Sequence, residues 1–281
     1  MIAPALSIVV TCKGRLAHLR QSLPRMAAQA GCECIVVDYD CPDGTAGWVR
    51  NTHPAVKLVE VPSAPRFNAG RARNLGAACA TGEWLAFIDA DVLVEPGFAA
   101  ALGDQLRRGR FYRPQPLQRE TMGCVVCHRS NFHAISGYDE VLENYGGEDV
   151  DLYYRLGRSG CAAAVFDASL LSPLAHDDHL RTAHHEIADV ELSRLINSAY
   201  NHIKFDLMRE SDSLSLPEET RRLVYGEVRR ALLDPRRGAA GSAQVAVTLP
   251  IRHHVPVPGG WEVRRRWTFD IEPASARRSP P

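Results

Sequence analysis

The stretch Trp84–Asp91 reads WLAFIDAD, in which five apolar residues run into two aspartates separated by one alanine. A short apolar run that ends in polar residues is typical of a strand buried in a sheet. Aspartates two residues apart can turn toward one point once the chain leaves the strand. Carboxylate oxygens are preferred ligands of Mg²⁺ and Mn²⁺, ions that commonly accompany phosphate groups. The stretch predicts a strand that ends in a metal-binding turn, with an ordinary solvated turn as the alternative.

Short apolar runs and helical patterns alternate along the sequence around this stretch. We expect strands over Leu6–Thr11, Cys34–Val37 and Lys57–Val61, and helices over Leu16–Ala28 and Ala69–Ala80. Such alternation is typical of βαβ units and of a mostly parallel sheet flanked by helices, which is an α/β fold. Loops at the carboxyl ends of the strands form the ligand-binding crevice of such sheets. The polar residues at these ends are Thr11, Asp38, Asp40, Asp89 and Asp91.

The second half of the chain contains further helical patterns and a β-rich tail. Helices are expected over Val150–Arg158, Glu186–Met208 and Pro217–Leu233, followed by a linker at Asp234–Ala243. The residues beyond the linker alternate like strands. We therefore expect an α/β domain at 1–180, a helical extension at 181–235, and a linker with a β-rich tail at 236–281.

The composition is that of a globular protein. The chain has 281 residues, of which 45% are hydrophobic and 23% charged, and this excludes disordered and fibrous classes. Lysines and arginines number 33, as do aspartates and glutamates. The balanced charge gives no reason to expect nucleic acid as the main partner.

Cysteine usage and the absence of targeting signals indicate a reducing, cytoplasmic location. The eight cysteines are too sparse for a disulfide scaffold, and Cys34, Cys79 and Cys161 lie in apolar runs where buried thiols are expected. The first charged residue is Lys13, so a basic signal-peptide start is missing. No uncharged apolar stretch approaches the ~18 residues of a membrane-spanning helix. Peripheral contact with a membrane stays open.

The run Cys124-Val-Val-Cys127-His128 has the Cys-x-x-Cys-His spacing of a c-type haem attachment site. Haem attachment requires secretion, and nothing in the sequence directs secretion. The same run alternates small and apolar residues, and we therefore interpret it as a buried strand.

An acidic pair follows two glycines in Tyr145-Gly-Gly-Glu148-Asp149. The pair is expected at a helix N-terminus, where the helix dipole favours ionised carboxylates. Adjacent residues do not share one helix face, so the two carboxylates should have different roles. A carboxylate held near an acceptor hydroxyl can act as a general base. An ordinary helix cap with an acidic first turn is the alternative.

Four histidines gather within ten residues, at His176, His179, His184 and His185. Neutral imidazole is a common metal ligand. Surface histidines, or a helix start capped by the aspartates between His176 and His179, are the alternative interpretation.

Four segments, taken in order, resemble the inverting, nucleotide-sugar-dependent glycosyltransferases of family 2, which have a GT-A fold. They are SIVVTCKGR (7–15), IVVDYDCPDGT (35–45), FNAGRARNLGAACATGEWLAFIDADV (67–92) and FHAISGYDEVLENYGGEDVDLYYRL (132–156). The last segment is most similar to the galactosyltransferase-like C-terminal module of β-1,4-galactosyltransferases and bacterial chondroitin-type polymerases, which carries Gly-Gly-Glu-Asp after an aromatic residue. The resemblance covers about residues 5–180.

This resemblance implies a Rossmann-like, mixed but mostly parallel sheet flanked by helices, with a C-terminal helical and β extension. It also implies Mn²⁺ or Mg²⁺ as cofactor, bound by Asp91 and His176, with Asp89 at the metal's water shell or the ribose and His179 as the reserve ligand. Asp149 would be the catalytic base, and Glu148 would hold the acceptor or donor sugar. Tyr145 and the glycines would form a small lid over the donor. The nucleotide and its sugar would contact Thr11, Arg15, Asp38 (at the uracil), Arg66, Asn68, Arg73 and Asp89.

The resemblance implies transfer of a sugar from a nucleotide-sugar, a UDP-linked hexose or N-acetylhexosamine, to an acceptor hydroxyl. Tyr145 replaces the usual tryptophan of galactosyltransferases, and Tyr39 replaces the second acid of a common Asp-Asp pair. The resemblance therefore does not imply which particular donor sugar and acceptor are used. The acceptor is a glycan, a lipid-linked sugar, a peptide or a small molecule.

Two other functions fit parts of the pattern. One is an inactive module that binds a sugar or nucleotide without turnover. The other is a sugar-1-phosphate nucleotidyltransferase, which would need a glycine-rich phosphate loop after the first strand. The segment Thr11–Arg15 contains one glycine, which disfavours this second alternative.

Overall fold

The computed structural model describes residues 5–175, 177–234, 242–250 and 264–273, and these form two compact units, Met1–Val190 and Glu191–Pro281. Each unit is treated by itself. His176 and Pro258–Gly260 lie outside the described residues. The division of the chain into parts at residues 180 and 235, which we expected from the sequence, stays a prediction.

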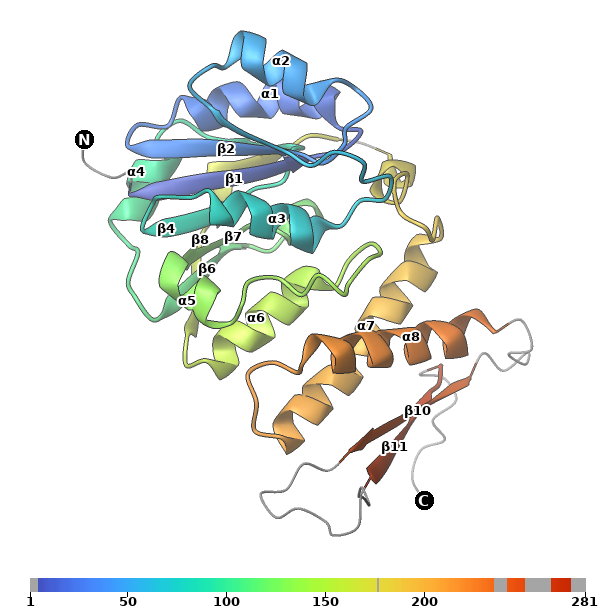
Figure 1. Cartoon of the computed structure of the whole chain (residues 1–281). Helices are drawn as coiled ribbons and strands as arrows, with labels where there is room; N and C mark the ends of the chain where they lie inside the picture. Colours follow the sequence, from blue (N-terminus) through green and yellow to red (C-terminus); the bar gives the residue numbers. More distant parts are fainter. Residues whose placement is uncertain (1–4, 176, 235–241, 251–263, 274–281) are drawn as a thin grey trace. The chain divides into compact units, whose positions relative to one another are not determined.

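The first unit is built on a seven-stranded sheet with the order β3-β2-β1-β4-β7-β6-β8 (Figure 1). Strands β3, β2, β1 and β4 are parallel, β7 is antiparallel to both of its neighbours, and β6 pairs with β8 in parallel. A second, two-stranded sheet pairs β5 with β9. The strands are β1 (Leu6–Cys12), β2 (Cys32–Asp38), β3 (Lys57–Glu60), β4 (Trp84–Phe87), β5 (Val92–Val94), β6 (Arg110–Gln115), β7 (Val125–His128), β8 (Ala162–Asp167) and β9 (Leu171–Pro173).

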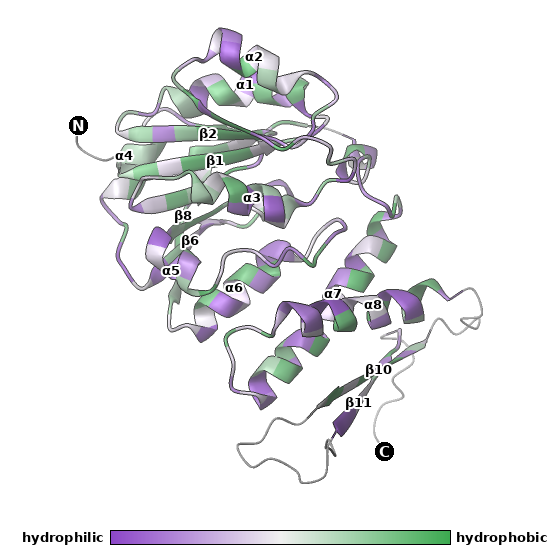
Figure 2. Ribbon diagram, in the orientation of Figure 1, coloured by the Kyte–Doolittle hydropathy of each residue, from purple (hydrophilic) through white to green (hydrophobic). Residues whose placement is uncertain are grey.

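Helices cover both faces of the large sheet, as Figure 1 shows for α1 and α2 on one side and α3 and α6 on the other. The alternating side chains of β1 divide between two cores: Ile8 and Val10 pack with α1 and α4, whereas Val9 packs with α3, α5 and α6. Strand β1 is coloured hydrophobic along most of its length in Figure 2, as expected of a strand covered on both faces. The helices are α1 (Leu16–Ala27), α2 (Thr45–Thr52), α3 (Ala69–Ala78), α4 (Phe98–Gly103), α5 (Arg129–Ala134) and α6 (Glu148–Arg158).

The second unit contains α7 (Val190–Glu210), α8 (Glu218–Leu233) and a hairpin of β10 (Ala243–Pro250) and β11 (Arg264–Ile271). The two helices meet where the rings of Tyr200 and Tyr225 pack edge to face, with 5.2 Å between their centres. The Tyr225 hydroxyl donates a hydrogen bond to Asn197.

The structure confirms the α/β architecture and most predicted elements, including the strand at Val125–His128 in place of a haem attachment site. Two details were wrong. The helix expected from Glu186 begins at Val190, because the preceding residues are held in a loop: the Ile187 amide donates to Asn144, and Thr182 donates to the Ala188 carbonyl. Cys79 is exposed rather than buried, because it caps the C-terminus of α3.

No helix in the described part of the chain is long and apolar enough to span a membrane.

Close packing of α3 on the sheet predicts a penalty for a side chain at Gly76. A Cβ added there would lie 2.4 Å from a Val9 methyl and 3.0 Å from one of Val37, and neither short, branched side chain can move far. Gly76→Ala should therefore lower the free energy of unfolding by about 1–3 kcal/mol in denaturant titrations. Gly157 in α6 faces open space, so Gly157→Ala should raise it by up to ~1 kcal/mol. Equal effects of the two substitutions would contradict this packing.

Candidate functional site

The predicted site residues gather at one edge of the large sheet because of strand direction. Strands β1, β2 and β4 are parallel, so Cys12, Asp38 and the Asp89–Asp91 turn follow the same ends. Strand β7 runs the other way, and the residue before it, Cys124, therefore lies at this edge too. This edge is where ligands bind in open α/β sheets.

The guanidinium of Arg73, on α3, joins the two acidic motifs. Its Nη2 donates to Asp89 at 2.8 Å, and its Nη1 donates to Glu148 at 2.9 Å. The guanidinium carbon also lies 5.2 Å from the centre of the Tyr138 ring, a cation–π contact. Arg73 is only 6% exposed. A buried arginine of this kind is tolerated because carboxylates from two different elements neutralise it.

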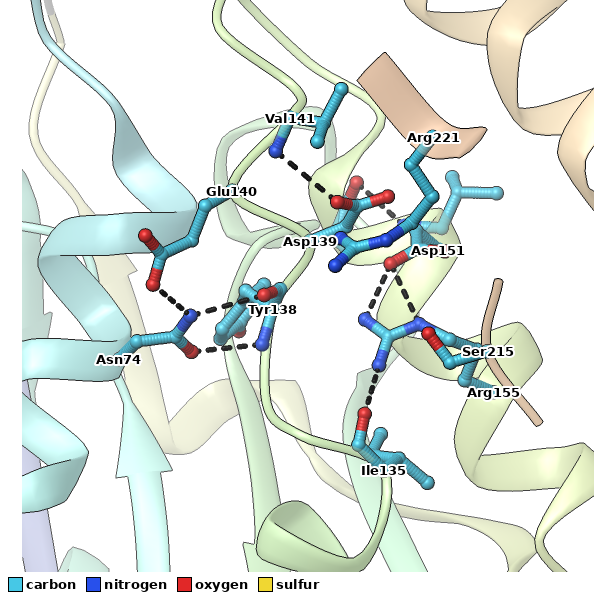
Figure 3. A network of polar contacts seen from close by, with 12 residues as sticks. Asn74, Ile135, Tyr138, Asp139, Glu140, Val141, Asp151, Arg155, Ser215 and Arg221 are labelled. Carbon is cyan, nitrogen blue, oxygen red and sulfur yellow. Dashed lines mark hydrogen bonds and ion pairs between the residues drawn. The ribbon is translucent and has the colours of Figure 1, made fainter. Parts of the chain in front are cut away.

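Amide side chains position the helix that carries Arg73. Asn68 caps α3, since its carbonyl oxygen accepts from the Arg71 amide and its Nδ2 donates to the Glu140 carbonyl, both at 2.8 Å. Nearly two turns along the helix, Asn74 exchanges hydrogen bonds with the backbone of Tyr138 and also donates to the Glu140 side chain (Figure 3). These bonds tie α3 to the 138–140 loop and so set where Arg73 points.

The acidic pair lies at the start of α6, as expected, and its two carboxylates have different surroundings. Gly147 precedes the helix with φ of 90°, a left-handed conformation that only glycine adopts without strain. Glu148 pairs with Arg73, whereas Asp149 is 9% exposed and its Oδ1 accepts from the Val150 amide. Burial, together with the Glu148 charge, raises the pKa of Asp149 from 3.8 to about 7. The helix dipole favours the ionised form of Asp149, but desolvation acts in the opposite direction and is the larger effect.

Two further contacts of Arg155 fix helix α6 in place. Arg155 pairs with Asp151 one turn away and also donates to the Ile135 carbonyl at 2.6 Å, as Figure 3 shows. Both side chains are fully or nearly fully buried. This pair anchors the helix whose first turn presents Glu148 and Asp149.

The Asp89–Asp91 turn has its own supports. The Val92 amide donates to the Asp89 carbonyl, and Ser22 of α1 donates to the Ala90 carbonyl at 2.7 Å. The Asp91 carboxylate lies 3.4 Å from Arg15, with both side chains largely buried. The Asp91 carbonyl accepts from the Leu174 amide at 2.7 Å, so the chain passes beside Asp91 two residues before His176.

The Asp89–Asp91 turn offers two carboxylates, but the described residues do not complete a set of metal ligands around them. A Cβ added to Gly123 would lie 2.9 Å from Asp89 Oδ2, so the glycine leaves room beside that oxygen. Hard carboxylate oxygens are the ligands that Mn²⁺ and Mg²⁺ take. Across the described ranges, no three His, Cys, Asp or Glu side chains form a group that could hold a metal ion. His179 is 71% exposed and lies near Asp177, not in such a group with the two aspartates.

The remaining predicted nucleotide contacts are distributed around the same edge. Both carboxylate oxygens of Asp38 accept backbone amides, from Cys41 at 2.7 Å and Ala46 at 2.6 Å, so Asp38 shapes the loop after β2. Thr11 lies one residue before the end of β1 and is partly exposed. Arg66 is exposed and pairs with Glu186.

Sequence reasoning missed Lys13, which fastens two loops of this edge. Its buried ammonium donates to three carbonyls, those of Tyr39 and Asp40 after β2 and that of Ala64, at 2.7–3.1 Å. Only three lysines occur among the 33 basic residues. The sequence did contain a signal for this role, because one of these few lysines comes directly after a predicted buried strand.

Part of the histidine-rich segment packs on the first loop and on the loop before α6. His184 lies so close to Gly14 that a Cβ added there would overlap its ring. His185 contacts Phe67 and the Glu143 carbonyl, and Arg181 donates to the Tyr145 hydroxyl at 2.9 Å. In the structure, these residues therefore support loops of the candidate site.

Two family models match segments of the first unit. Residues 7–119 match the model of glycosyl transferase family 2, and residues 110–184 match that of the N-terminal domain of galactosyltransferase. No curated protein matches the chain.

Solved structures share the fold at low sequence identity. A mannosyltransferase, PcManGT from Pyrobaculum calidifontis, in complex with GDP-Man and Mn²⁺, aligns with a TM-score of 0.55 and 17% identity, over 84% of this chain and 72% of its own. TarS of S. aureus, residues 1–349 in complex with UDP-GlcNAc, aligns with a TM-score of 0.58 and 12% identity, over 80% of this chain and 72% of its own. The comparisons thus show a GT-A fold, with residues 7–119 similar to glycosyl transferase family 2 and residues 110–184 similar to the N-terminal domain of galactosyltransferase.

Proposed function

We propose that this chain transfers a sugar from a nucleotide-sugar, a UDP-linked hexose or N-acetylhexosamine, to an acceptor hydroxyl, with inversion and with a divalent cation. The observation that carries the proposal is the Arg73 bridge, which holds Glu148 beside the Asp89 turn with the buried carboxyl of Asp149 next to it. The complexes of the two structural neighbours with GDP-Man and with UDP-GlcNAc support a nucleotide-sugar donor. Residues 1–180 would form the catalytic domain.

Asp149 is the proposed general base. A base works best when its pKa lies near the working pH, because it is then ionised and still attracts a proton. Burial gives Asp149 a pKa of about 7, in contrast to an ordinary aspartate. Its carboxylate would take the proton of the acceptor hydroxyl as that oxygen attacks the anomeric carbon opposite the leaving nucleotide.

Glu148 and Arg73 are proposed to position the reacting groups. Glu148 is held by Arg73 with 15% of its side chain exposed, so one oxygen can meet a sugar hydroxyl while the other is paired. Because Arg73 reaches both Glu148 and Asp89, the sugar-binding acid and the metal-side acid keep a defined separation.

Asp91, Asp89 and His176 are the proposed residues for Mn²⁺ or Mg²⁺. The Leu174–Asp91 backbone bond supports His176 as a ligand, since it brings the chain to Asp91 two residues earlier. When bound, the cation would supply the Lewis-acid effect that neutralises charge on the diphosphate leaving group.

The nucleotide itself is proposed to lie over the loops after β1 and β2. Thr11 lies near the end of β1 and Arg15 lies in the loop after it, and Asp38 holds the second loop in shape through its two backbone bonds. Asn68, Arg66 and Arg73 would face the donor from α3 and the segment before it. The acceptor would be a glycan, a lipid-linked sugar, a peptide or a small molecule.

Asp149→Asn tests the base. Transfer, followed by release of UDP from a UDP-sugar with Mn²⁺, should fall by about 10²–10⁴-fold while UDP affinity is kept. In the unchanged protein, kcat/KM should rise as the pH increases through about 7, because the ionised form is the active one. Turnover retained in the variant would refute the base assignment, and UDP binding without turnover in the unchanged protein would indicate an inactive module.

The same variant makes a separate prediction about stability. The folded-state pKa of Asp149 lies above the ordinary value of 3.8, so its ionisation opposes folding, and this cost grows between about pH 4 and pH 7. Asp149→Asn should therefore raise Tm at pH 8 and change it little at pH 4. A gain in Tm that is equal at both pH values would contradict the burial of this charge.

Asp91→Ala tests the metal site. Mn²⁺-dependent UDP affinity, measured by calorimetry, should fall at least about tenfold, because a ligand that links the cation to the phosphates is lost. Asp104→Ala removes an exposed aspartate at the end of α4 and should leave the affinity unchanged. An Asp91 variant that binds UDP in the presence of Mn²⁺ as tightly as the unchanged protein does would count against the ligand role.

Arg73→Met tests the bridge. Removing one partner of a buried ion pair leaves unpaired carboxylates, so the free energy of unfolding should fall by about 3 kcal/mol, the lower end for such pairs because the Asp89 side chain is 31% exposed. Arg66→Met breaks an exposed pair with Glu186 and should cost less than about 1 kcal/mol. Similar costs for the two variants in urea titrations would show that Arg73 does not hold the site together.

A further inference from the structure

Two cysteine sulfurs meet at the edge of the sheet where β1 and β2 end. Cys12 is the last residue of β1, and Cys41 lies in the loop between β2 and α2. Their sulfur atoms are 4.0 Å apart, which is van der Waals contact, and both thiols are free. Cys12 is buried, whereas Cys41 is partly exposed. The function proposed above uses neither side chain.

Hydrogen-bond donors surround the Cys41 sulfur. The Gly14 amide and the Thr45 hydroxyl each lie 3.2 Å from it, and the Cys12 thiol, with its sulfur 4.0 Å away, forms a further hydrogen bond with it. Cys41 also lies just before the N-terminus of α2, where the helix dipole favours an anion. The backbone amide of Asp43, in the same loop, donates a further hydrogen bond to Cys41, and the titratable side chain of His184 interacts with Cys41 from another segment. These surroundings favour a thiolate at Cys41.

The two thiols are accordingly unequal. Hydrogen bonds, first of all from Cys12, lower the pKa of Cys41 to about 5. The same bond, together with burial, raises the pKa of Cys12 well above its usual range. Burial alone raises the pKa of Cys32 to about 11. A partly exposed thiolate next to a protonated thiol is the arrangement found in reactive dithiols.

We infer that Cys41 and Cys12 form a peroxide-sensitive dithiol, in which Cys41 is the attacking sulfur and Cys12 the resolving one. The Cys41 thiolate attacks one oxygen of a peroxide, forms a sulfenic acid and releases hydroxide, or alkoxide from an organic peroxide, which takes up a proton. The Cys12 sulfur then attacks the sulfenic sulfur, and its proton leaves with the hydroxyl group as water. Two thiols are oxidised to one disulfide, and the peroxide receives the two electrons.

The disulfide would join the two loops at the donor edge. Forming it requires the sulfurs to approach by about 2 Å, which shifts the loop after β1 relative to the loop after β2. The Cys41 amide is one of the two groups that Asp38 holds, so movement of Cys41 also affects the predicted uracil contact. Oxidation should therefore weaken donor binding, and this consequence rests on the proposed function.

Mapping the oxidised protein tests the dithiol. After stoichiometric hydrogen peroxide, the count of eight thiols in denatured protein should fall by two, and digestion should yield one peptide pair linked through Cys12 and Cys41. In Cys12→Ser, which keeps a hydrogen-bond donor beside Cys41 but cannot form a disulfide, Cys41 should stop at the sulfenic acid and be trapped by dimedone. Cys79→Ala removes an exposed cysteine and should change neither result. An unlinked Cys41, or Cys41 joined to another cysteine, would overturn the inference.

Alkylation provides a test that needs no oxidant. The rate at Cys41 with iodoacetamide should change by less than about threefold between pH 6 and pH 8, whereas the rate of an ordinary thiol rises about tenfold per pH unit in this range. A rate at Cys41 that follows the ordinary profile would overturn the thiolate assignment.

Donor binding is measured separately. UDP affinity with Mn²⁺ should fall by about 10- to 100-fold on oxidation, return after dithiothreitol, and be insensitive to peroxide in Cys12→Ser. A linked protein with unchanged UDP affinity would refute the coupling to donor binding. Reduced protein that binds no UDP would refute the proposed function instead, and the peptide map would still decide the dithiol chemistry.

Discussion

The candidate site depends on one buried cation, the guanidinium of Arg73. A guanidinium removed from water is costly unless its charge and its donors are matched, and here Asp89, Glu148 and the face of the Tyr138 ring match it. Because the two carboxylates come from the turn after β4 and from the start of α6, satisfying Arg73 also places these elements side by side. The position of α3 is in turn set by the amide contacts of Asn68 and Asn74.

This bridge accounts for the contrast between two adjacent acids. Glu148 accepts a hydrogen bond from Arg73, whereas Asp149 lies in a buried environment near Tyr138 and Tyr153. Desolvation and the neighbouring Glu148 charge then raise the pKa of Asp149 toward neutrality, despite its place at a helix N-terminus. Two carboxylates whose environments differ in this way are suited to different tasks, one to holding a hydroxyl and the other to moving a proton.

The opposite side of the site is organised by backbone contacts. Lys13 caps three carbonyls of the loops after β2 and β3, and Asp38 accepts two amides of the loop that contains Cys41. These contacts fix the shape of the loops. The loop after β2 also carries Cys41, whose sulfur lies 4.0 Å from that of Cys12.

The sequence by itself determined the α/β architecture and most of the elements. Strands that are buried on both faces need continuous apolar runs, and helices that pack on a sheet need apolar residues at helical spacing, so both leave local patterns in the sequence. It also indicated the acids at the strand and helix ends. The pairing of Arg73 with two separate acids, the burial of Asp149, the buried Lys13 and the contact of Cys12 with Cys41 were decided by the tertiary structure alone. Each of these joins segments far apart in the chain, and the balance between desolvation and pairing at such a contact depends on distances that no local pattern encodes.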